Sequence, residues 1–583
     1  MFSVALVLLD MKKLIFGFLL IVSCFACHSP KKTTTETLNI NPFQFSIQKK
    51  IVCDNGAVVS AHPLASKVGV EILKQGGNAI DAAIATQLAL AVVYPGAGNI
   101  GGGGFMVARL SNGKLLALDY RETAPLQADR DMYLDENGNV ENGKSLNGHF
   151  ASGVPGTIAG LFASARYGKL SFAKLIQPAI DLAEKGFVLT DREASSLNSI
   201  QNDLKQFNTA MPVFVKENGW RTGDTLIQAD LANTLKRIRD TGERGFYEGE
   251  TARLIVEEMK RGGGIITPQD LKNYKARFRE PHVFDYKGYK IVGMPMPSSG
   301  GILVHQMMRM IEDKNIGAMG FQTPASVQLM AEVERRAFAD RAEYMGDADF
   351  HNVPEKTLVS DEYLKQRMKD YVAGVASDSK KVQPGAAAKK ESEETTHLSV
   401  IDKNGNAVAV TTTLNNSYGS KTVVAGAGFF LNDEMDDFSA KPGVPNLYGA
   451  VGGEANAIAP GKRMLSSMTP TVVLKNDKPY LVVGTPGGTT IPTSVFQTLV
   501  NILEFNMGTE DAVYKPKFHH QWLPDTLDLE KGFDNTVKEA LEKMGYKTIL
   551  RGGIGRTEAI KVLNDGRFEA VGDNRGDDDA EGY

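Results

Sequence analysis

Cysteine is scarce in this sequence. Its 583 residues include 3 cysteines, Cys24, Cys27 and Cys53, so a framework of disulfides is excluded and the fold must depend on its core. An excess of positive charge is also missing, because the formal net charge is −4. With no basic stripe interleaved with aromatic residues, the sequence argues against a nucleic-acid partner. Length alone leaves open two or more ordinary domains or one large layered domain.

A long membrane-spanning run is missing as well. The apolar run at residues 14–22 follows Met11-Lys12-Lys13 and is shorter than the roughly 20 residues that cross a bilayer. This pattern is typical of a signal peptide, which we place at residues 1–23, and the true start of the chain is then Met11. A plain cleaved signal or an uncleaved anchor remains an alternative.

The cysteines after this run indicate how the signal ends. Ile21-Val22-Ser23-Cys24 resembles a bacterial lipobox, in which the cysteine is acylated and becomes the mature N-terminus. Cys27 is a second candidate. We therefore expect an exported, periplasmic or cell-envelope protein, held at the membrane by a lipid anchor only, with residues 24–50 as a tether.

Glycine is abundant, with 59 residues, and concentrates in tight loops. Gly101–Gly104 lacks the lysine of a P-loop and the full dinucleotide fingerprint, so we expect a loop that needs close backbone approach rather than a phosphate site. Gly487-Gly488 follows an apolar run that predicts a strand and precedes a predicted helix at 492–505. From the residues alone it is either a simple strand-to-helix turn or a loop that presents backbone N–H groups.

The stretch from Thr395 onward reads TTHLSVIDKNGNAVAVTTTLN. Apolar and polar residues alternate on both sides of Asn404-Gly405, which predicts a hairpin with strands near 395–402 and 406–413. Residues 377–394 have almost no large apolar side chain, which predicts a mobile surface linker. A linker that ends at a Thr-Thr pair on a strand edge indicates self-cleavage between Glu394 and Thr395.

Cleavage there would create its own catalytic group. A threonine hydroxyl is a weak nucleophile, but a freed α-amino group, with a pKa of roughly 8, can act as the base for the hydroxyl of its own residue. The alternative from the hairpin alone is that Thr395 merely begins a strand.

Several motifs together decide between these alternatives. The hairpin is followed, in order, by DEMDDFSAKPGVPNLYG, KRMLSSMTPT and GTPGG. From about Val58 to Tyr583, the sequence closely resembles the γ-glutamyltranspeptidases, a family of N-terminal-nucleophile hydrolases. The resemblance implies a four-layer αββα sandwich of α+β class. It also implies a precursor that divides into a large subunit, 51–394, and a small subunit, 395–583, which remain together as a heterodimer.

The resemblance also implies residue roles. Thr395 matches the nucleophile, Thr413 the threonine that orients it, and Gly487-Gly488 the oxyanion loop. Other residues match the positions that hold the amino acid head group of the donor: Arg121, Ser466 and Ser467 for the α-carboxylate, and Asn415, Glu434 and Asp437 for the α-amino group. Tyr448 matches the gating aromatic of a lid loop, which favours small donors such as glutathione.

The implied activity is γ-glutamyl transfer and glutathione hydrolysis, with no cofactor and no metal. Donors would be glutathione and other γ-glutamyl compounds, and acceptors would be water, amino acids or dipeptides. Two alternatives remain open. One is a related acylase that cleaves glutaryl side chains, whose donor carries no ammonium group. The other is an uncleaved lipoprotein that binds γ-glutamyl compounds without catalysis.

Some residues have a simpler explanation than catalysis. Arg121 alone could be a surface cation. Glu434, Asp436 and Asp437 alone could be a solvated acidic turn or a calcium loop, although they lack the alternating ligand pattern of an EF-hand. His397 alternates with apolar neighbours and is expected to be structural. His519-His520 lacks a third ligand at zinc spacing. The acidic tail with Arg575 predicts a local salt-bridged terminus.

Overall fold

The computed structural model describes residues 40–141, 143–382, 395–441 and 453–583. The predicted signal peptide with Cys24 and Cys27, the cleavage residue Glu394 and the lid residue Tyr448 lie outside these ranges. In the part of the chain that is described, no helix is both long and apolar enough to cross a membrane.

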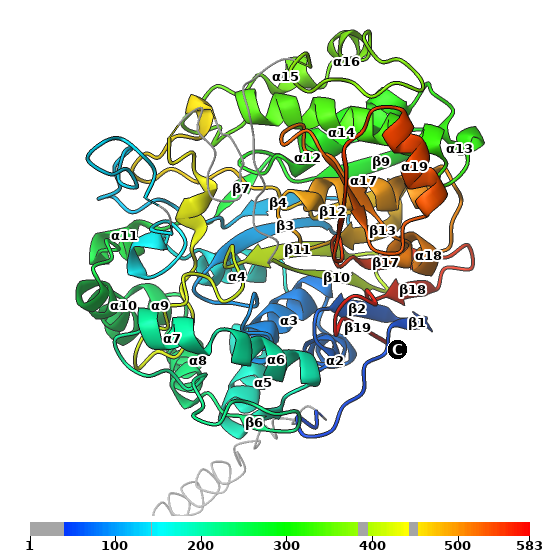
Figure 1. Ribbon diagram of the computed structural model, residues 1–583. Coiled ribbons are helices and arrows are strands. Elements are labelled where there is room, and N and C mark those ends of the chain that lie inside the picture. Colours follow the sequence, from blue (N-terminus) through cyan, green and yellow to red (C-terminus); the bar gives the residue numbers. More distant parts are fainter. Residues whose placement is uncertain (1–39, 142, 383–394, 442–452) are drawn as a thin grey trace, which may run out of the picture. The chain divides into compact units, whose positions relative to one another are not determined.

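Two seven-stranded sheets form the centre of the molecule (Figure 1). The first has the order β19-β2-β10-β11-β3-β4-β7, with strands at Asp579–Gly582, Gly56–Ser60, Thr396–Asp402, Ala407–Thr413, Gly103–Arg109, Leu115–Asp119 and Arg277–Arg279. The second has the order β1-β18-β17-β13-β12-β9-β8, with strands at Lys50–Cys53, Phe568–Val571, Glu558–Val562, Lys478–Gly484, Thr471–Lys475, Tyr289–Gly293 and His282–Tyr286. Every pairing within both sheets is antiparallel.

The two sheets pack face to face through one apolar layer. Val59, Val107 and Ala409 of the first sheet belong to the same buried cluster as Val472 and Val482 of the second. Alternate residues of each strand point into this layer because side chains alternate between the faces of a sheet. Both faces of β10 and β11 are covered, and every residue of these two strands is buried.

Helices cover the outer face of each sheet, which confirms the predicted αββα sandwich (Figure 1). The first sheet packs on α2, α3 and α4, and the second packs on α12, α17 and α18. The α-helices lie at Pro63–Lys74 (α2), Ala79–Val93 (α3), Thr157–Ala165 (α4), Phe172–Lys185 (α5), Asp191–Ser199 (α6), Gln201–Phe207 (α7), Ala229–Thr241 (α8), Arg244–Tyr247 (α9), Gly249–Gly262 (α10), Pro268–Asn273 (α11), Gly300–Ile311 (α12), Ile316–Met319 (α13), Pro324–Tyr344 (α14), Glu355–Leu358 (α15), Asp361–Arg367 (α16), Thr490–Leu503 (α17), Thr509–Tyr514 (α18) and Asn535–Lys543 (α19).

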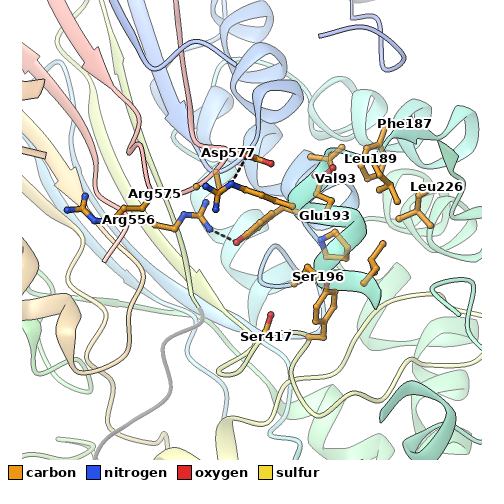
Figure 2. A pocket seen from close by; sticks show the side chains of 18 residues that line it. Val93, Phe187, Leu189, Glu193, Ser196, Leu226, Ser417, Arg556, Arg575 and Asp577 are labelled. Carbon is orange, nitrogen blue, oxygen red and sulfur yellow. Dashed lines mark hydrogen bonds and ion pairs between the residues drawn. The ribbon is translucent and has the colours of Figure 1, made fainter. Parts of the chain in front are cut away.

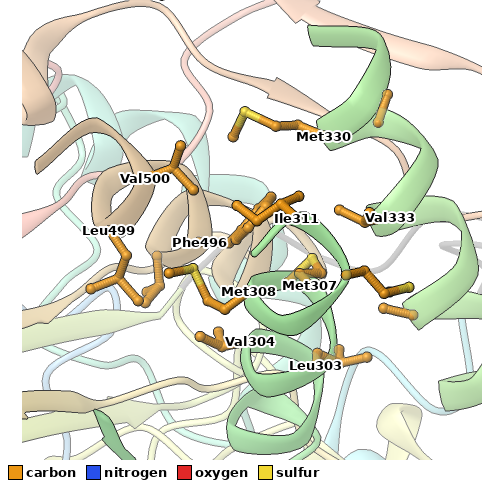
Figure 3. Packing of buried hydrophobic residues seen from close by; sticks show 14 of the residues in the cluster. Leu303, Val304, Met307, Met308, Ile311, Met330, Val333, Phe496, Leu499 and Val500 are labelled. Carbon is orange, nitrogen blue, oxygen red and sulfur yellow. The ribbon is translucent and has the colours of Figure 1, made fainter. Parts of the chain in front are cut away.

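A large apolar cluster lies over the outer face of the second sheet. Met307 and Met308 of α12 pack there with Phe496 and Leu499 of α17 and Val333 of α14 (Figure 3). Burying side chains of this size stabilises the fold by roughly 1.5–3 kcal/mol each. This cluster fixes α17, whose first residue follows the Gly487-Gly488 turn.

Short elements complete the described chain. Strands β14, β15 and β16 form a separate three-stranded sheet, and β5 pairs with β6; their bounds are Phe518–His519, Leu527–Glu530, Thr548–Arg551, Phe187–Val188 and Thr225–Leu226. Three 3₁₀ turns lie at His149–Ala151, Glu434–Asp437 and Glu454–Asn456.

The predicted hairpin is confirmed within one residue at each end. Strand β10 pairs with β11 from Thr396 opposite Thr412 to Ile401 opposite Ala407. At the turn, the Gly405 backbone adopts a φ of 78°, which glycine tolerates without steric cost. Thr395 therefore lies immediately before β10, which is an inner strand of the first sheet.

The mobile linker was predicted wrongly for residues 377–382. Ser379 is fully buried, and its backbone N–H donates to Asp525. The Trp522 indole N–H lies 2.8 Å from the Ser379 carbonyl oxygen and 3.1 Å from that of Val382. The segment lacks large apolar side chains, and hydrogen bonds to buried polar partners hold it against the fold instead.

The local salt-bridged tail was also predicted wrongly. Asp579 begins β19, which pairs with β2 beside β10, and the Asp578 carboxylate binds Arg556. Arg575 pairs with Glu530 and Asp573 rather than with the acidic run that follows it. The C-terminal segment is thus an edge strand of the first sheet. Backbone hydrogen bonds join it to β2, which its polar sequence did not indicate.

Candidate active site

A small cavity brings together most of the residues that the sequence singled out. Its lining consists of Arg121, Thr395, Thr413, Asn415, Glu434, Asp437, Ser466, Ser467, Met468, Gly488 and Ile491. These residues come from chain segments hundreds of positions apart. Gly487 is outside the lining, although its neighbour Gly488 is part of it.

Thr395 and Thr413 lie at the same end of the β10–β11 hairpin. Thr395 precedes β10, and Thr413 ends β11. The Thr413 hydroxyl accepts a hydrogen bond of 2.7 Å from the Asn415 backbone N–H. Asn415 follows with a φ of 76°, so the chain turns sharply here and places the Asn415 side chain in the same cavity as Thr395.

A buried amide holds this end of β11. Asn99 Nδ2 donates to the Thr413 carbonyl oxygen at 2.9 Å and to the Thr412 hydroxyl at 3.2 Å. Asn99 Oδ1 accepts from the Gly102 N–H at 3.1 Å and from the Thr157 hydroxyl at 2.7 Å. Asn99 therefore joins three segments around Thr413. The sequence analysis missed this role, because a single asparagine in a glycine-rich loop has no distinctive pattern.

The Gly101–Gly104 row is a close-approach loop, as predicted. A Cβ at Gly102 would lie 2.1 Å from the Thr413 carbonyl oxygen, and one at Gly101 would lie 2.1 Å from that of Phe430. Real Cβ atoms do not approach backbone oxygens so closely. Side chains are excluded here because the loop packs directly against the end of β11.

Arg121 is the buried cation of the cavity. It follows β4, and its guanidinium is 1% exposed. Arg121 Nη1 lies 2.5 Å from Glu434 Oε2 and 3.7 Å from Glu122 Oε2, and Nη2 binds Asp437 Oδ2. The alternative that Arg121 is a surface cation is therefore excluded. The alternative that Glu434 belongs to a solvated acidic turn is excluded as well.

Three carboxyl groups surround this one guanidinium. Burial raises the pKa of the Glu122 carboxyl to about 8, although the neighbouring Arg121 acts in the opposite direction. Burial likewise raises the pKa of Glu434 well above its ordinary value, against the effect of Arg121. Carboxylates that share a buried site repel one another, so the cluster retains a proton near neutral pH. Glu122 was missed by the sequence analysis, although it stands next to Arg121.

Ser466 and Ser467 reach the cavity from the segment that precedes β12. The Ser467 hydroxyl accepts from Arg341 Nη2 at 3.0 Å, and the Ser466 hydroxyl accepts from the Met468 backbone N–H at 3.2 Å. Ser299 fixes the backbone, because its N–H donates to the Ser466 carbonyl oxygen at 2.8 Å. Both hydroxyls are therefore fixed acceptors that can donate their protons to an anion.

The Gly487-Gly488 turn connects β13 to α17. The φ values are 133° at Gly487 and 55° at Gly488, which are favourable for glycine and strained for other residues. The two carbonyl oxygens accept from the N–H groups of Thr490 and Ile491. Since their own N–H groups precede the N-terminus of a helix, they are suited to stabilise negative charge.

The histidines have structural partners. His397 Nδ1 lies 2.9 Å from the Thr411 hydroxyl and Nε2 lies 3.1 Å from that of Ser399, and burial lowers its pKa to about 3. This confirms the structural role predicted for His397. His519 Nδ1 lies 2.9 Å from the Thr493 hydroxyl, and His520 Nε2 lies 3.3 Å from Asp525.

The chemistry available in this cavity is acyl transfer from a donor with an amino acid head group. A hydroxyl nucleophile, N–H groups before a helix, a buried guanidinium and several carboxylates meet in one place. The guanidinium suits a carboxylate, and the carboxylates suit an ammonium. No group of side chains that could bind a metal ion occurs among residues 40–141, 143–382, 395–441 and 453–583.

Known proteins match this chain both in sequence and in fold. A family model described as gamma-glutamyltranspeptidase matches residues 65–583. The chain is 47% identical to a glutathione hydrolase proenzyme of Escherichia coli over 90% of this chain and 91% of the relative. It is 36% identical to the acylase ACY 1 proenzyme of a Pseudomonas strain over 87% of this chain and 89% of that one.

Solved structures of two kinds share the fold. A cephalosporin acylase from Bacillus halodurans matches with a TM-score of 0.80 and 26% identity, and covers 94% of this chain and 99% of that chain. A γ-glutamyltranspeptidase from Helicobacter pylori matches with a TM-score of 0.55 and 42% identity, and covers 59% of this chain and 97% of that chain.

Proposed function

The chain belongs to the γ-glutamyltranspeptidase family, and from this premise we propose that it is a γ-glutamyltransferase and glutathione hydrolase. The observation that carries the proposal is the cavity in which Thr395 meets Arg121, Asn415 and Asp437. The first residue supplies the nucleophile, and the other three recognise the head group of a γ-glutamyl donor.

Maturation is the first step of the proposed mechanism. Hydrolysis of the Glu394–Thr395 peptide bond would free the Thr395 α-amino group and give chains of residues up to 394 and from 395. The H. pylori chain is almost fully covered by a match to 59% of this chain, as expected when the counterpart of one precursor consists of two chains. The E. coli and Pseudomonas relatives are likewise named as proenzymes.

Donor binding uses the ion cluster around Arg121. We assign the α-carboxylate to the guanidinium and to the hydroxyls of Ser466 and Ser467. We assign the α-ammonium to Asn415, Glu434 and Asp437. A zwitterion brings one charge of each sign, so it leaves the net charge of the buried cluster unchanged while giving each of its charged groups a new partner.

Acyl transfer then proceeds in two halves. The Thr395 hydroxyl attacks the γ-carbonyl carbon, its proton passes to the free α-amino group, and the N–H groups of Gly487 and Gly488 stabilise the oxyanion. The proton moves to the leaving amine, which for glutathione is Cys-Gly, and a γ-glutamyl ester remains on Thr395. Water or an acceptor amine attacks this ester, returns a proton to Thr395 and releases the product.

A matched pair of donors tests this function. γ-Glutamyl-p-nitroanilide and glutaryl-p-nitroanilide differ only in the α-amino group. We expect kcat/KM for the γ-glutamyl compound to be higher by about 100-fold, since an unpaired buried carboxylate is costly. The second candidate is an acylase, which the fold match to the B. halodurans enzyme supports. Preference for the glutaryl compound would establish that activity instead. Turnover of neither would leave only a binding protein.

We also propose that the protein is exported and anchored by a lipid on Cys24 or Cys27. The support is the lipobox-like sequence alone. Expression in a bacterium fed an alkyne fatty acid, with Cys24→Ser and Cys27→Ser variants, tests this directly. Label that disappears in one variant identifies the acylated cysteine, and a wild-type protein without label would refute the anchor.

A further inference from the structure

A second cavity, of about 280 Å³, has no role in the mechanism above. It shares no lining residue with the candidate active site. Its walls come from both sides of the predicted cleavage point: from α3, α6 and β6 on one side, and from the loop after β11 and the C-terminal segment on the other. A cavity of this size is near the lower limit for small-molecule sites, roughly 300–1,000 Å³.

One end of this cavity is apolar. Val93, Phe187, Leu189 and Leu226 line it together (Figure 2). All four side chains are nearly fully buried, so they close this end of the cavity, and the part of a ligand that lies beside it is best aliphatic or aromatic. A γ-glutamyl head group, which is polar throughout, does not fit this end.

The other end carries the guanidinium groups of Arg192, Arg556 and Arg575. Arg575 is already paired with Glu530 and Asp573. Arg192 Nε lies 3.3 Å from Asp577 Oδ1, and no partner is found for its two terminal nitrogens among the described residues. Arg556 binds Asp578 through Nε and Nη2 and donates to the Tyr94 hydroxyl through Nη1 at 2.6 Å. Figure 2 shows Arg556 and Asp577 at the end away from Phe187 and Leu226.

Neighbouring carboxylates limit the charge of a ligand. Asp577 and Glu193 line the same cavity as the arginines. Both already have partners, because Asp577 accepts from the Thr190 hydroxyl at 2.7 Å and Glu193 pairs with His62 at 2.9 Å. Their negative charge disfavours a dianion such as a phosphate monoester, whereas a single carboxylate matches the unused N–H groups of Arg192.

We propose that this cavity binds a small monocarboxylate with an aliphatic or aromatic body. Its carboxylate pairs with Arg192 and Arg556, and its body lies at the end that Phe187 and Leu226 close. The proposal goes beyond the γ-glutamyl chemistry and does not depend on it, since none of these residues belongs to the donor site.

The cavity is nevertheless linked to the candidate active site by two segments. Ser417 and Tyr418 line it and follow Asn415 by two and three positions in the sequence. The Arg556 backbone N–H donates to the Thr485 hydroxyl at 2.7 Å, just before the Gly487-Gly488 turn. A ligand here thus contacts the segment that follows Asn415, and it is linked to the oxyanion residues through Arg556.

Hexanoate is a suitable probe. Its binding to the purified full-length protein is measured by saturation-transfer NMR and calorimetry, with excess L-glutamate present to occupy the donor site. Hexan-1-ol and hexylamine are the charge controls. We expect hexanoate to bind in the presence of glutamate and to bind at least about tenfold more tightly than either control, the factor typical of a hydrogen bond to a charged group.

Variants assign the binding to this cavity. Arg192→Gln should weaken hexanoate binding about tenfold, and Ser196→Phe should abolish it by filling the space. Arg244→Gln, on the exposed surface, is the matched control and should have no effect. Circular dichroism and Tm check that each variant is folded, and Arg192→Gln carries the test if Ser196→Phe does not fold. Equal binding of hexylamine, loss of binding with glutamate, or unchanged binding in Arg192→Gln would overturn the proposal.

Discussion

At the residue scale, the proposed donor site depends on Arg121. Its two terminal nitrogens bind two different carboxylates, Glu434 and Asp437, and its side chain is 1% exposed. Arg121→Lys keeps the charge but removes the planar pair of donors. We expect kcat/KM for γ-glutamyl-p-nitroanilide to fall on the order of 10- to 100-fold, mainly through KM.

The control for this substitution is Arg244→Lys on the exposed surface, which should leave both kinetic constants unchanged. Maturation of the Arg121→Lys precursor, followed on denaturing gels, should continue, because the cleavage chemistry does not need the head-group site. An unchanged KM would show that Arg121 has no part in donor binding.

Glu122 predicts a pH dependence of stability. Burial raises its pKa to about 8 from an ordinary value of 4.5. The folded protein therefore keeps this proton over a pH range in which the unfolded chain has lost it. Its contribution to the free energy of unfolding is full below about pH 4.5 and is lost as the pH rises to about 8.

Glu122→Gln has no such proton to lose. We expect the difference in Tm between wild type and Glu122→Gln to change in favour of the variant as the pH rises from 5 to 8, measured by calorimetry. Using the difference removes the contributions of other buried carboxyls, such as Asp579, whose pKa burial raises to about 7. A difference in Tm that is constant with pH would mean that Glu122 titrates normally.

At the scale of elements, the glycine loop and the β10–β11 hairpin fit together without space for side chains. Gly102→Ala would place a Cβ 2.1 Å from the Thr413 carbonyl oxygen and so displace the end of β11. We expect kcat for glutathione hydrolysis to fall at least about tenfold and Tm to fall, since overpacking costs roughly 1–3 kcal/mol.

Gly508→Ala is the matched control, because a Cβ there would meet no atom within 4 Å. It should leave kcat and Tm near the wild-type values. If Gly102→Ala behaved like Gly508→Ala in both measurements, the close packing of this loop against Thr413 would have no catalytic importance.

The same elements show what the sequence could predict. Alternation around Asn404-Gly405 was enough for β10 and β11, because both strands have regular side-chain patterns and a turn signal. The strand β19 was missed, because DAEG has little apolar character and its place in the sheet depends on backbone pairing with β2. The packed segment at Ser379 was missed for a similar reason, since its contacts are polar and distant in sequence.

The site was predicted through family resemblance rather than through local pattern. Arg121, Thr395 and Ser466 are far apart in the sequence, and no periodicity indicates that they share a cavity. The residue types of each motif indicate its chemistry. They do not indicate that the motifs lie close together, because this depends on stacking of the two sheets. Asn99 and Glu122 were missed because each acts on a neighbour of the reaction centre.

At the scale of the whole molecule, the described chain packs as one layered sandwich in which both predicted subunits share each sheet. Strand β10 of the small subunit lies between β2 of the large subunit and its own partner β11. Cleavage before Thr395 would thus leave the two chains joined by hydrogen-bonded strands and a common core. We expect them to copurify without any disulfide between them, because residues 395–583 contain no cysteine.

Self-cleavage before Thr395 is tested by the intact masses of the purified wild-type and Thr395→Ala proteins, with N-terminal sequencing of each chain. We expect two chains for the wild type, the smaller beginning Thr-Thr-His-Leu, and one uncleaved, inactive chain for Thr395→Ala. A wild-type protein that hydrolyses glutathione as a single chain, or a Thr395→Ala protein that is cleaved and active, would contradict it.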